Sequence, residues 1–579
     1  MSRTSVSIAS GAFYSGAETI SSQYFGGNIL FDRDKLGETG TYDEKAAALN
    51  LGLIRYPGGN VTELFFDIAD PEKTIEPDGH SGQLLPFSDF LAYLNETGVK
   101  GSFVAPTGAF MDGLATGEMT VTEVRQQMRS FLNKLKKGKY GDASLIEHIE
   151  IGNEYYGYEK FYDWSAVEQY AEIAPLWAKE IRKVFGDDVN ISVQGGANAD
   201  DNAVFIEAFQ GKGDLIDSVI YHSYPWELGQ VYNHDTWKSW LWNQWEDAGL
   251  TEAIFLSEWG LSNQRLGPDG EVVGTDQIED GLARAIAMVE MASLQILSGV
   301  DYATVWPVQQ NTRGDLAGNE GQTAENSAST LSPDGLTLAG EAFQMMSEVL
   351  PGMKILDVGG PIDLDGKRKS DRYSAELLVR AYEDAEKIVV FASAWALDDA
   401  LGAATLKLDL QGAFTSYDVT TLTVAGENYT NPNADPITLV ETILPVGDEL
   451  TINFNRSYEL QRLTIYKDES AGSASVSPNS GFAGVDNNLV GSASDELLIG
   501  EEDVADGVWG KGGDDKLYGL GAGDQLNGGA GSDSLYGGMG LTCCKVAVAW
   551  TVCMAAWAAI SWLALRTLIA YEGKRVKTR

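Results

Sequence analysis

Short apolar runs alternate with longer helical patterns along the first 350 residues of the chain. Eight of these runs have the length of buried strands and span residues 24–29, 53–56, 102–105, 149–151, 191–194, 218–221, 253–256 and 302–305. Three of the stretches between them, residues 121–135, 166–184 and 277–297, carry apolar side chains at the three- and four-residue spacing of helices. Eight such units predict a (β/α)8 TIM barrel over residues 23–350.

After residue 350 the hydrophobic pattern changes to a period of two. Residues 374–382, 387–393, 404–410 and 459–467 alternate apolar and polar side chains, which is typical of antiparallel strands. We therefore expect an antiparallel β-sandwich over residues 351–467 that braces the barrel. The N-terminal segment, residues 1–22, contains a short run at residues 4–8 that we expect to add a strand to the sandwich.

A glycine-rich repeat follows a linker of Ser, Gly and Ala at residues 468–483. Within residues 484–540, nonapeptides such as GKGGDDKLY and GGAGSDSLY recur in phase, with aspartates at Asp515, Asp524 and Asp533. The repeat resembles the RTX, or haemolysin-type, calcium-binding repeats. The resemblance implies a C-terminal parallel β-roll with structural calcium, and the three aspartates are the candidate ligands. Gly- and Asp-rich disorder is the alternative interpretation.

Residues 541–579 depart from the composition of the rest of the chain. They hold six basic residues against one acidic residue, and they contain Cys543, Cys544 and Cys553, the three cysteines of the chain. Residues 546–565 carry no charge, which is typical of a transmembrane helix with a basic flank. A shifted reading frame would instead allow further nonapeptides here, so we favour a frameshift near Gly540 over a membrane anchor.

The chain is strongly acidic, with a formal net charge of −43. This charge argues against nucleic acid or an anionic membrane surface as partner, because both would be repelled. The first 540 residues contain no cysteine, so no disulfide framework is expected there, and the N-terminus lacks the apolar segment of a signal peptide. We expect a secreted, extracellular protein whose export is directed from elsewhere in the chain.

Two glutamates stand where barrel enzymes place their chemistry. Glu154 follows the fourth predicted strand and Glu258 follows the seventh, so both carboxylates are expected at the C-terminal face of the barrel. Two carboxylates in that position suggest the paired-carboxylate chemistry of glycoside cleavage.

Residues 23–350 resemble the retaining glycoside hydrolases of clan A. The resemblance rests on Asn153-Glu154, on Glu258, and on Arg55-Tyr56-Pro57-Gly58-Gly59 followed by Phe65-Phe66-Asp67. That last element is similar to the heparanase-type β-glucuronidases and the α-L-arabinofuranosidases. The resemblance implies that Glu154 is the general acid/base, with a raised pKa, and that Glu258 is the nucleophile about 5–5.5 Å away.

The resemblance also implies roles for residues around the two glutamates. Asn153 would bond the sugar 2-OH, and Asn28 would contact the sugar directly. Arg55 would stabilise the charge of Glu258, and polar groups on the sixth strand would orient it. Tryptophans at strand ends would stack on sugar faces. The remaining candidates are His222, Tyr224, Trp226, Trp259 and Trp306.

Two functions of different class are compatible with these patterns. One is a secreted retaining glycosidase that acts on a carbohydrate, needs no cofactor for catalysis, and uses the RTX module for type I secretion machinery and calcium-triggered folding. The other is a calcium-binding surface or adhesion protein with a non-catalytic, glycan-binding barrel. We expect the polar loop after the eighth strand, residues 307–335, to border the substrate cleft.

Overall fold

The computed structural model divides into two compact units, Met1–Lys467 and Asp468–Arg579. It describes the chain apart from residues 1–2, 33, 38–39, 75–83, 161–164, 226–239, 252, 263–264, 267–271, 275–280, 310–314, 319–334, 359–376, 395–403, 412–415, 425–435, 444–448, 455–456, 468–486, 491–495, 501–505, 510–514, 519–524, 528–533, 540–542, 546–551 and 557–579. Each unit is considered by itself below.

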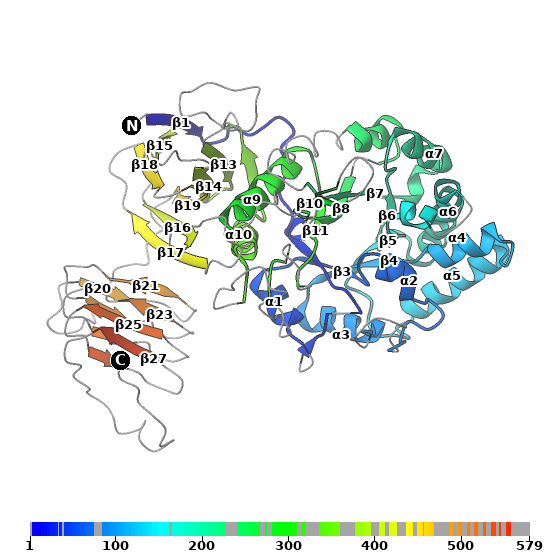
Figure 1. The fold of residues 1–579 in the computed structure, drawn as a ribbon, viewed down its shortest axis with the longest axis horizontal. Helices are drawn as coiled ribbons and strands as arrows, with labels where there is room; N and C mark the ends of the chain where they lie inside the picture. The colour runs from blue at the N-terminus through cyan, green and yellow to red at the C-terminus, as the bar shows by residue number, and fades with distance from the viewer. Residues whose placement is uncertain are drawn as a thin grey trace, which may run out of the picture. The chain divides into compact units, whose positions relative to one another are not determined.

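The first unit contains a closed barrel of eight parallel strands (Figure 1). In order around the barrel they are β2 (Gly26–Asn28), β3 (Leu53–Tyr56), β4 (Lys100–Ala105), β5 (Ile146–Ile151), β6 (Asn190–Gln194), β7 (Ser218–Ser223), β8 (Ala253–Trp259) and β11 (Tyr302–Val305). Each predicted strand region holds one of them, so the barrel prediction is confirmed. Strands β7 and β8 continue further than predicted, which places His222 and Glu258 inside strands.

Helices cover the outside of the barrel. They include α1 (Tyr42–Ala48), α2 (Val61–Phe65), α3 (Phe87–Thr97), α4 (Gly108–Ala115), α5 (Val121–Lys136), α6 (Ala166–Phe185), α7 (Ala199–Phe209), α9 (Leu282–Leu297) and α10 (Leu338–Ser347). Helix α5 begins at a capping box between Thr120 and Glu123, and the Ser165 side chain caps α6. Helix α9 begins at Leu282, later than the predicted residue 277.

The antiparallel region after the barrel forms two sheets, as predicted. One has the order β12 (Lys354–Leu356), β13 (Leu377–Glu383), β14 (Lys387–Ala394), β19 (Leu460–Tyr466), β16 (Ser416–Val424) and β17 (Pro436–Ile443). The other contains β15 (Ala404–Gln411) between β18 (Glu449–Phe454) and the N-terminal β1 (Arg3–Ala9), which pairs with β15 in parallel. The expected N-terminal strand is therefore present.

The sandwich packs on helix α9 of the barrel. Nearly every residue of α9 is buried, as expected for a helix that is covered on both sides. A buried ion pair joins Arg380 of β13 to Glu290 of α9, and the hydroxyls of Tyr382 and Ser293 lie 2.7 Å apart. These contacts attach the sandwich to the barrel through polar groups as well as apolar ones.

In the second unit, successive short strands alternate between two parallel sheets. One sheet contains β20 (Asn487–Val490), β22 (Asp506–Trp509), β24 (Gln525–Asn527) and β26 (Cys543–Lys545). The other contains β21 (Leu497–Ile499), β23 (Lys516–Tyr518), β25 (Ser534–Met539) and β27 (Val552–Ala556). Leu517 pairs with Leu535, two nonapeptides later, and both are buried in one small apolar cluster. Paired strands of this sheet are therefore offset by two nonapeptides.

The described residues of the C-terminal tail do not contain the transmembrane helix that was the alternative to a frameshift. Within the uncharged stretch 546–565, residues Val552–Ala556 form strand β27, which pairs with β25, and the rest of that stretch lies outside the described residues. Across the described part of the chain, helices are too short or too polar to cross a bilayer.

The lower part of the barrel interior encloses a histidine. His148 on β5 is fully buried. The centroid of its ring lies 4.5 Å from the ring centroid of Tyr302 and 5.3 Å from that of Phe255. Its Nε2 lies 2.9 Å from Oε1 of Gln23. Burial lowers the pKa of His148 to about 4, so the imidazole is neutral at pH 7.

His148 should make the folded chain sensitive to acid. The unfolded state binds a proton on this residue near pH 6.5, while the folded state binds it only near pH 4. Stability is therefore lost as pH falls through this window, by about 3 kcal/mol in total. In the variant His148→Leu, the free energy of unfolding measured by urea titration should depend less steeply on pH between 6.5 and 4. Equal slopes in both proteins would refute this prediction.

Candidate active site

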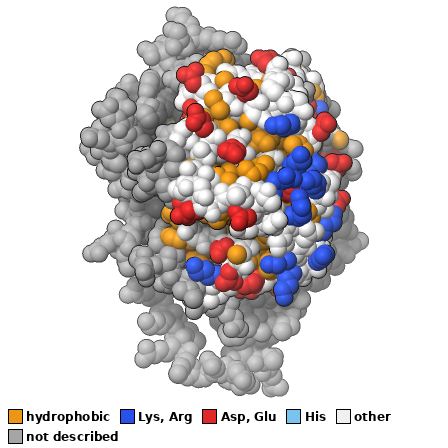
Figure 2. Space-filling view, turned by 90° about the vertical axis from the view of Figure 1, so that its right-hand side faces the viewer, with side chains coloured by type: hydrophobic (Ala, Val, Ile, Leu, Met, Phe, Trp, Pro, Cys, Tyr) orange, Lys and Arg blue, Asp and Glu red, His pale blue; other side chains and the backbone are white. Residues whose placement is uncertain are grey.

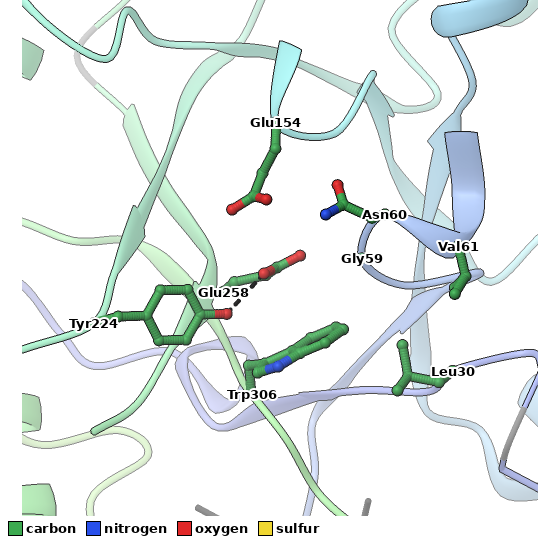
Figure 3. A pocket seen from close by; sticks show the side chains of 8 residues that line it. All are labelled: Leu30, Gly59, Asn60, Val61, Glu154, Tyr224, Glu258 and Trp306. Carbon is green, nitrogen blue, oxygen red and sulfur yellow. Dashed lines mark hydrogen bonds between the residues drawn. The ribbon is translucent and has the colours of Figure 1, made fainter. Parts of the chain in front are cut away.

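The two glutamates lie at one cavity at the C-terminal end of the barrel (Figure 3). Glu258 is on β8 and Glu154 follows β5, and both side chains point into a cavity of about 310 Å³. The other lining residues are Leu30, Gly59, Asn60, Val61, Tyr224 and Trp306. The structure thus brings together two carboxylates that are 104 positions apart in the sequence.

Glu154 and Glu258 are close enough to act on one bond. A carboxylate oxygen of each and a ring nitrogen of His222 all lie within 4.8 Å of one another. Glu154 has a backbone φ of 45°, in the left-handed region that residues with a side chain seldom adopt. The sharp turn after β5 directs its carboxylate toward Glu258, and such strain is common at functional sites.

Arg55 of β3 connects the residues around the cavity from inside the barrel. The guanidinium is fully buried and donates four hydrogen bonds. Nε donates to Oε2 of Glu150 (2.9 Å), Nη1 to Oε1 of Glu258 (2.8 Å) and to Oδ1 of Asn28 (2.9 Å), and Nη2 to Oδ1 of Asn153 (2.8 Å). The expected contact between Arg55 and Glu258 is present.

Asn28 and Asn153 face protein partners, not the cavity. Both are 1% exposed. Asn28 donates to the main-chain oxygens of Ser257 (3.0 Å) and Val305 (3.1 Å), and its Oδ1 accepts from Arg55. It therefore holds Arg55 in place. The expected direct contact between Asn28 and a sugar is not supported, because the side chain does not face the cavity. Asn153 donates to Oδ1 of Asn60 (3.0 Å), and it is Asn60 that lines the cavity.

A buried glutamate on helix α2 supports the turn that carries Glu154. The carboxylate of Glu63 accepts hydrogen bonds from the main-chain nitrogens of Thr107 (2.7 Å), Gly108 (2.8 Å) and Asn153 (2.8 Å). Burial raises the pKa of Glu63, and these hydrogen bonds oppose that effect. Glu63 thereby links α2, the start of α4 and the residue before Glu154.

His222 lies between the two carboxylates. Its Nδ1 is 3.0 Å from Oε1 of Glu154 and 3.5 Å from Oε2 of Glu258, and its Nε2 is 3.2 Å from the hydroxyl of Ser257. Tyr224 donates to Oε2 of Glu258 at 2.7 Å, which confirms that groups near the end of the sixth barrel strand contact this glutamate. Burial beside the two glutamates raises the pKa of Tyr224 well above its usual value, so it remains a donor.

The expected raised pKa of Glu154 is not observed. Burial raises it, but hydrogen bonds from His222 and Tyr156 and the charge of Arg55 lower it more, to about 2. The hydroxyl of Tyr156 donates to Oε1 of Glu154 at 2.7 Å. In this arrangement Glu154 is ionised, and His222 Nδ1 lies within hydrogen-bond distance of its carboxylate.

The three predicted tryptophans differ in their positions. Trp306 lines the cavity, and its ring lies so close to Gly59 that a Cβ there would meet it at 2.4 Å. Trp259 is fully buried, with its ring 6.2 Å from those of Tyr24 and Phe343, so the prediction that it stacks on sugar is wrong. Trp226 and most of the loop 307–335 lie outside the described residues.

Sequence reasoning missed Asn60, Glu63 and Tyr156. Asn60 directly follows the Pro57-Gly58-Gly59 element, and Tyr156 is two residues after Glu154, so proximity to quoted motifs could have identified both. Glu63 gave no such signal, because its role depends on where helix α2 lies relative to β5.

The cluster of Glu154, His222 and Glu258 also has the composition of a cation site. Its ligand atoms already have donors, however: Tyr156 on Glu154, and Arg55 and Tyr224 on Glu258. A cation would have to compete with a buried guanidinium for the same carboxylate. This donor set therefore fits carboxylate chemistry on an organic substrate better than metal binding.

Solved structures similar to this chain include glycoside hydrolases. They include the GH51 arabinofuranosidase from Xanthomonas axonopodis pv. citri, with a TM-score of 0.55, 13% identity and coverage of 80% of this chain and 99% of that one. AbfB, a family 51 α-L-arabinofuranosidase from Bifidobacterium longum, has a TM-score of 0.56, 14% identity and coverage of 80% and 99%. A glucosidase from Croceicoccus marinus has a TM-score of 0.53 and 15% identity, with coverage of 80% of this chain and 99% of that one.

No protein-family model and no curated protein sequence matches the chain. At these identities the similarity to solved structures shows the fold: a TIM barrel combined with an antiparallel sheet domain.

Arg55→Met should destabilise the first unit strongly. The variant leaves the buried carboxylates of Glu150 and Glu258 without their shared cation, which typically costs about 3–5 kcal/mol. The measurement is the free energy of unfolding in urea at pH 7. Arg55→Lys is the matched control, since it keeps the charge but lacks the planar fork, and it should lose less. A Met variant as stable as the Lys variant would show that the buried charge is not what matters.

Proposed function

We propose that this protein is a retaining glycoside hydrolase that cleaves a polysaccharide or glycoside by a two-glutamate double displacement. The observation that carries the proposal is the placement of Glu154 and Glu258, with carboxylate oxygens within 4.8 Å, at one cavity. Retaining enzymes hold their carboxyl groups about 5–5.5 Å apart, whereas inverting enzymes leave about 6.5–9.5 Å for a water molecule. The observed proximity supports the retaining mechanism.

In the first step Glu258 attacks the anomeric carbon and forms a glycosyl-enzyme ester. Hydrogen bonds from Arg55 and Tyr224 fix the carboxylate for this attack. The glycosidic carbon–oxygen bond breaks, and the leaving oxygen takes a proton from Glu154. In the second step Glu154 removes a proton from water, the water oxygen displaces Glu258, and the sugar leaves with its original configuration.

Glu154 must carry a proton when the glycosidic bond breaks, although its hydrogen bonds in the free protein favour the ionised carboxylate. His222 Nδ1 lies 3.0 Å from Oε1 of Glu154, so it can hold this carboxyl group in position while the proton passes to the leaving oxygen. Trp306 supplies an apolar wall for the sugar.

We further propose that the second unit is an RTX calcium module and that the protein is extracellular and exported by type I secretion machinery. Support comes from the two parallel sheets, their offset of two nonapeptides, and the carboxylate of Asp515, which is 1% exposed and accepts from the main-chain nitrogen of Glu496 at 2.8 Å. A buried carboxylate oxygen fits a hard cation such as Ca²⁺. Asp524 and Asp533 lie outside the described residues.

Substitution of the two glutamates should separate their roles. Glu258→Ala should abolish cleavage of every glycoside, because no nucleophile remains. Glu154→Ala should lose about 10²–10⁴ in rate on substrates with poor leaving groups, yet retain formation of the glycosyl-enzyme from dinitrophenyl glycosides, which need no protonation. The test uses wild-type and variant proteins on arabinofuranosides, glucosides, xylosides and glucuronides.

Added azide provides the control for this assignment. It should rescue turnover of Glu154→Ala and give a glycosyl azide of retained configuration. Rescue of Glu258→Ala with inverted product would mean that the roles are exchanged. A wild-type protein that binds glycans but cleaves none of these substrates would favour the alternative, a calcium-binding adhesion protein.

Calcium should stabilise the second unit and leave the barrel unchanged. In calorimetry of the full chain, millimolar Ca²⁺ should raise the melting temperature of one transition only, because binding of metal to the folded state is linked to folding. Asp515→Asn should reduce that shift, while Asp187→Asn, an exposed site on the barrel, should not. Identical melting with and without Ca²⁺ would contradict the calcium proposal.

A further inference from the structure

Helices α5 and α6 form a basic surface on the outer wall of an acidic protein. Figure 2 shows Lys and Arg side chains gathered on the face of the first unit that carries these helices. We call residues 121–139 and 176–185 the α5–α6 surface. The two helices pack side by side. None of their residues lines the cavity that holds Glu154 and Glu258, so this surface is separate from the proposed active site.

The charge of this surface is the reverse of that of the whole chain. Its two segments hold nine basic and two acidic residues, whereas the chain holds 41 basic and 84 acidic residues. Because acidic residues outnumber basic ones twofold overall, an excess of this size within 29 positions is a local concentration of positive charge. An anion approaching the protein would be repelled elsewhere and attracted here.

Ion pairs compensate only part of this charge. Lys136 pairs with Asp188, and Arg182 pairs with Asp187 and Asp217. Arg125, Arg129 and Lys183 all bind the single carboxylate of Glu180, at 2.8, 2.7 and 3.2 Å. That carboxylate is 0% exposed, while the three cations are 32%, 47% and 45% exposed. Three cations on one buried carboxylate leave two positive charges facing solvent.

Further lysines add to this excess. Lys134, Lys137, Lys139 and Lys179 are exposed, and none of them has an ion-pair partner within the described part of the chain. Lysine side chains without partners can turn toward an incoming anion without first breaking a salt bridge. The surface therefore combines fixed arginines, held by Glu180, with free lysines around them.

We propose that the α5–α6 surface binds a polyanionic polysaccharide, such as a chain of uronic acids, at a distance from the cavity. A flexible single chain is narrow enough to follow two adjacent helices, and its repeated charges match several cations at once. A wide, stiff polyanion such as duplex DNA would also meet the acidic remainder of the protein. The choice of a glycan over other polyanions rests on the proposed function.

This inference refines what the net charge alone indicates. A net charge of −43 argues against polyanionic partners only if the charge is spread evenly. The α5–α6 surface shows that it is not, so a glycan chain held there would keep the protein at its substrate while the cavity acts on neighbouring units. The expected gain is in binding to polymers and not in cleavage of small glycosides.

The test compares binding of the full-length protein to polygalacturonate and to uncharged arabinan, over a series of NaCl concentrations. Wild type should bind polygalacturonate more tightly, with an affinity that falls linearly on a log–log plot against salt. The triple variant Lys134→Ser, Lys137→Ser, Lys179→Ser should lose at least about tenfold in affinity, and its slope should fall by about 2–3, as expected when three fewer counterions are displaced.

A matched triple variant on other parts of the first unit, Lys73→Ser, Lys354→Ser, Lys387→Ser, controls for net charge and should bind like wild type. Equal losses in both triples, equal binding to arabinan, or tighter binding to duplex DNA or anionic vesicles than to polygalacturonate would overturn the proposal. Turnover of an aryl glycoside is measured in parallel. The turnover rate should be the same in wild type and in both triple variants. If wild type does not turn over the aryl glycoside, that result counts against the proposed function and not against the α5–α6 surface.

Discussion

The structure depends most on the buried guanidinium of Arg55. It lies in the barrel interior, where a charge without partners would be very costly, and it is tolerated because all its bonds go to Glu150, Glu258, Asn28 and Asn153. Ser102 donates to the far oxygen of Glu150 at 2.6 Å, which completes that carboxylate's bonding. One side chain from β3 therefore fixes groups on β2, β5 and β8 relative to one another.

This network explains why the two glutamates differ although both are carboxylates at strand ends. Glu258 is bonded directly to Arg55 and Tyr224, so its charge is held in one place. Glu154 stands on a strained turn that Glu63 supports from behind, and its named partners, His222 and Tyr156, both bind the same oxygen. The other oxygen has no donor among these contacts, which suits the group proposed to exchange protons with substrate and water.

The barrel could be predicted from sequence because its strands are short apolar runs buried on both faces, each separated from the next by a helix. The same burial explains the error at Trp259. In a strand that is apolar on both faces, the pattern does not say which side chain points inward, and here Glu258 does while Trp259 packs against Tyr24 and Phe343. Glu63 and the low pKa of Glu154 could not be predicted, since both depend on contacts between distant elements.

The parallel pairing of β1 with β15 has a consequence for biosynthesis. Arg3 lies beside Thr405, so strand β1 leaves the ribosome some 400 residues before its partner. At about 5–20 residues per second, that interval is roughly 20–80 s. The barrel strands β2 to β11 are all made within it, whereas Val6 and Ile8 can be buried only afterwards. The sandwich is thus completed only after the barrel has been synthesised, and its N-terminal strand is secured late.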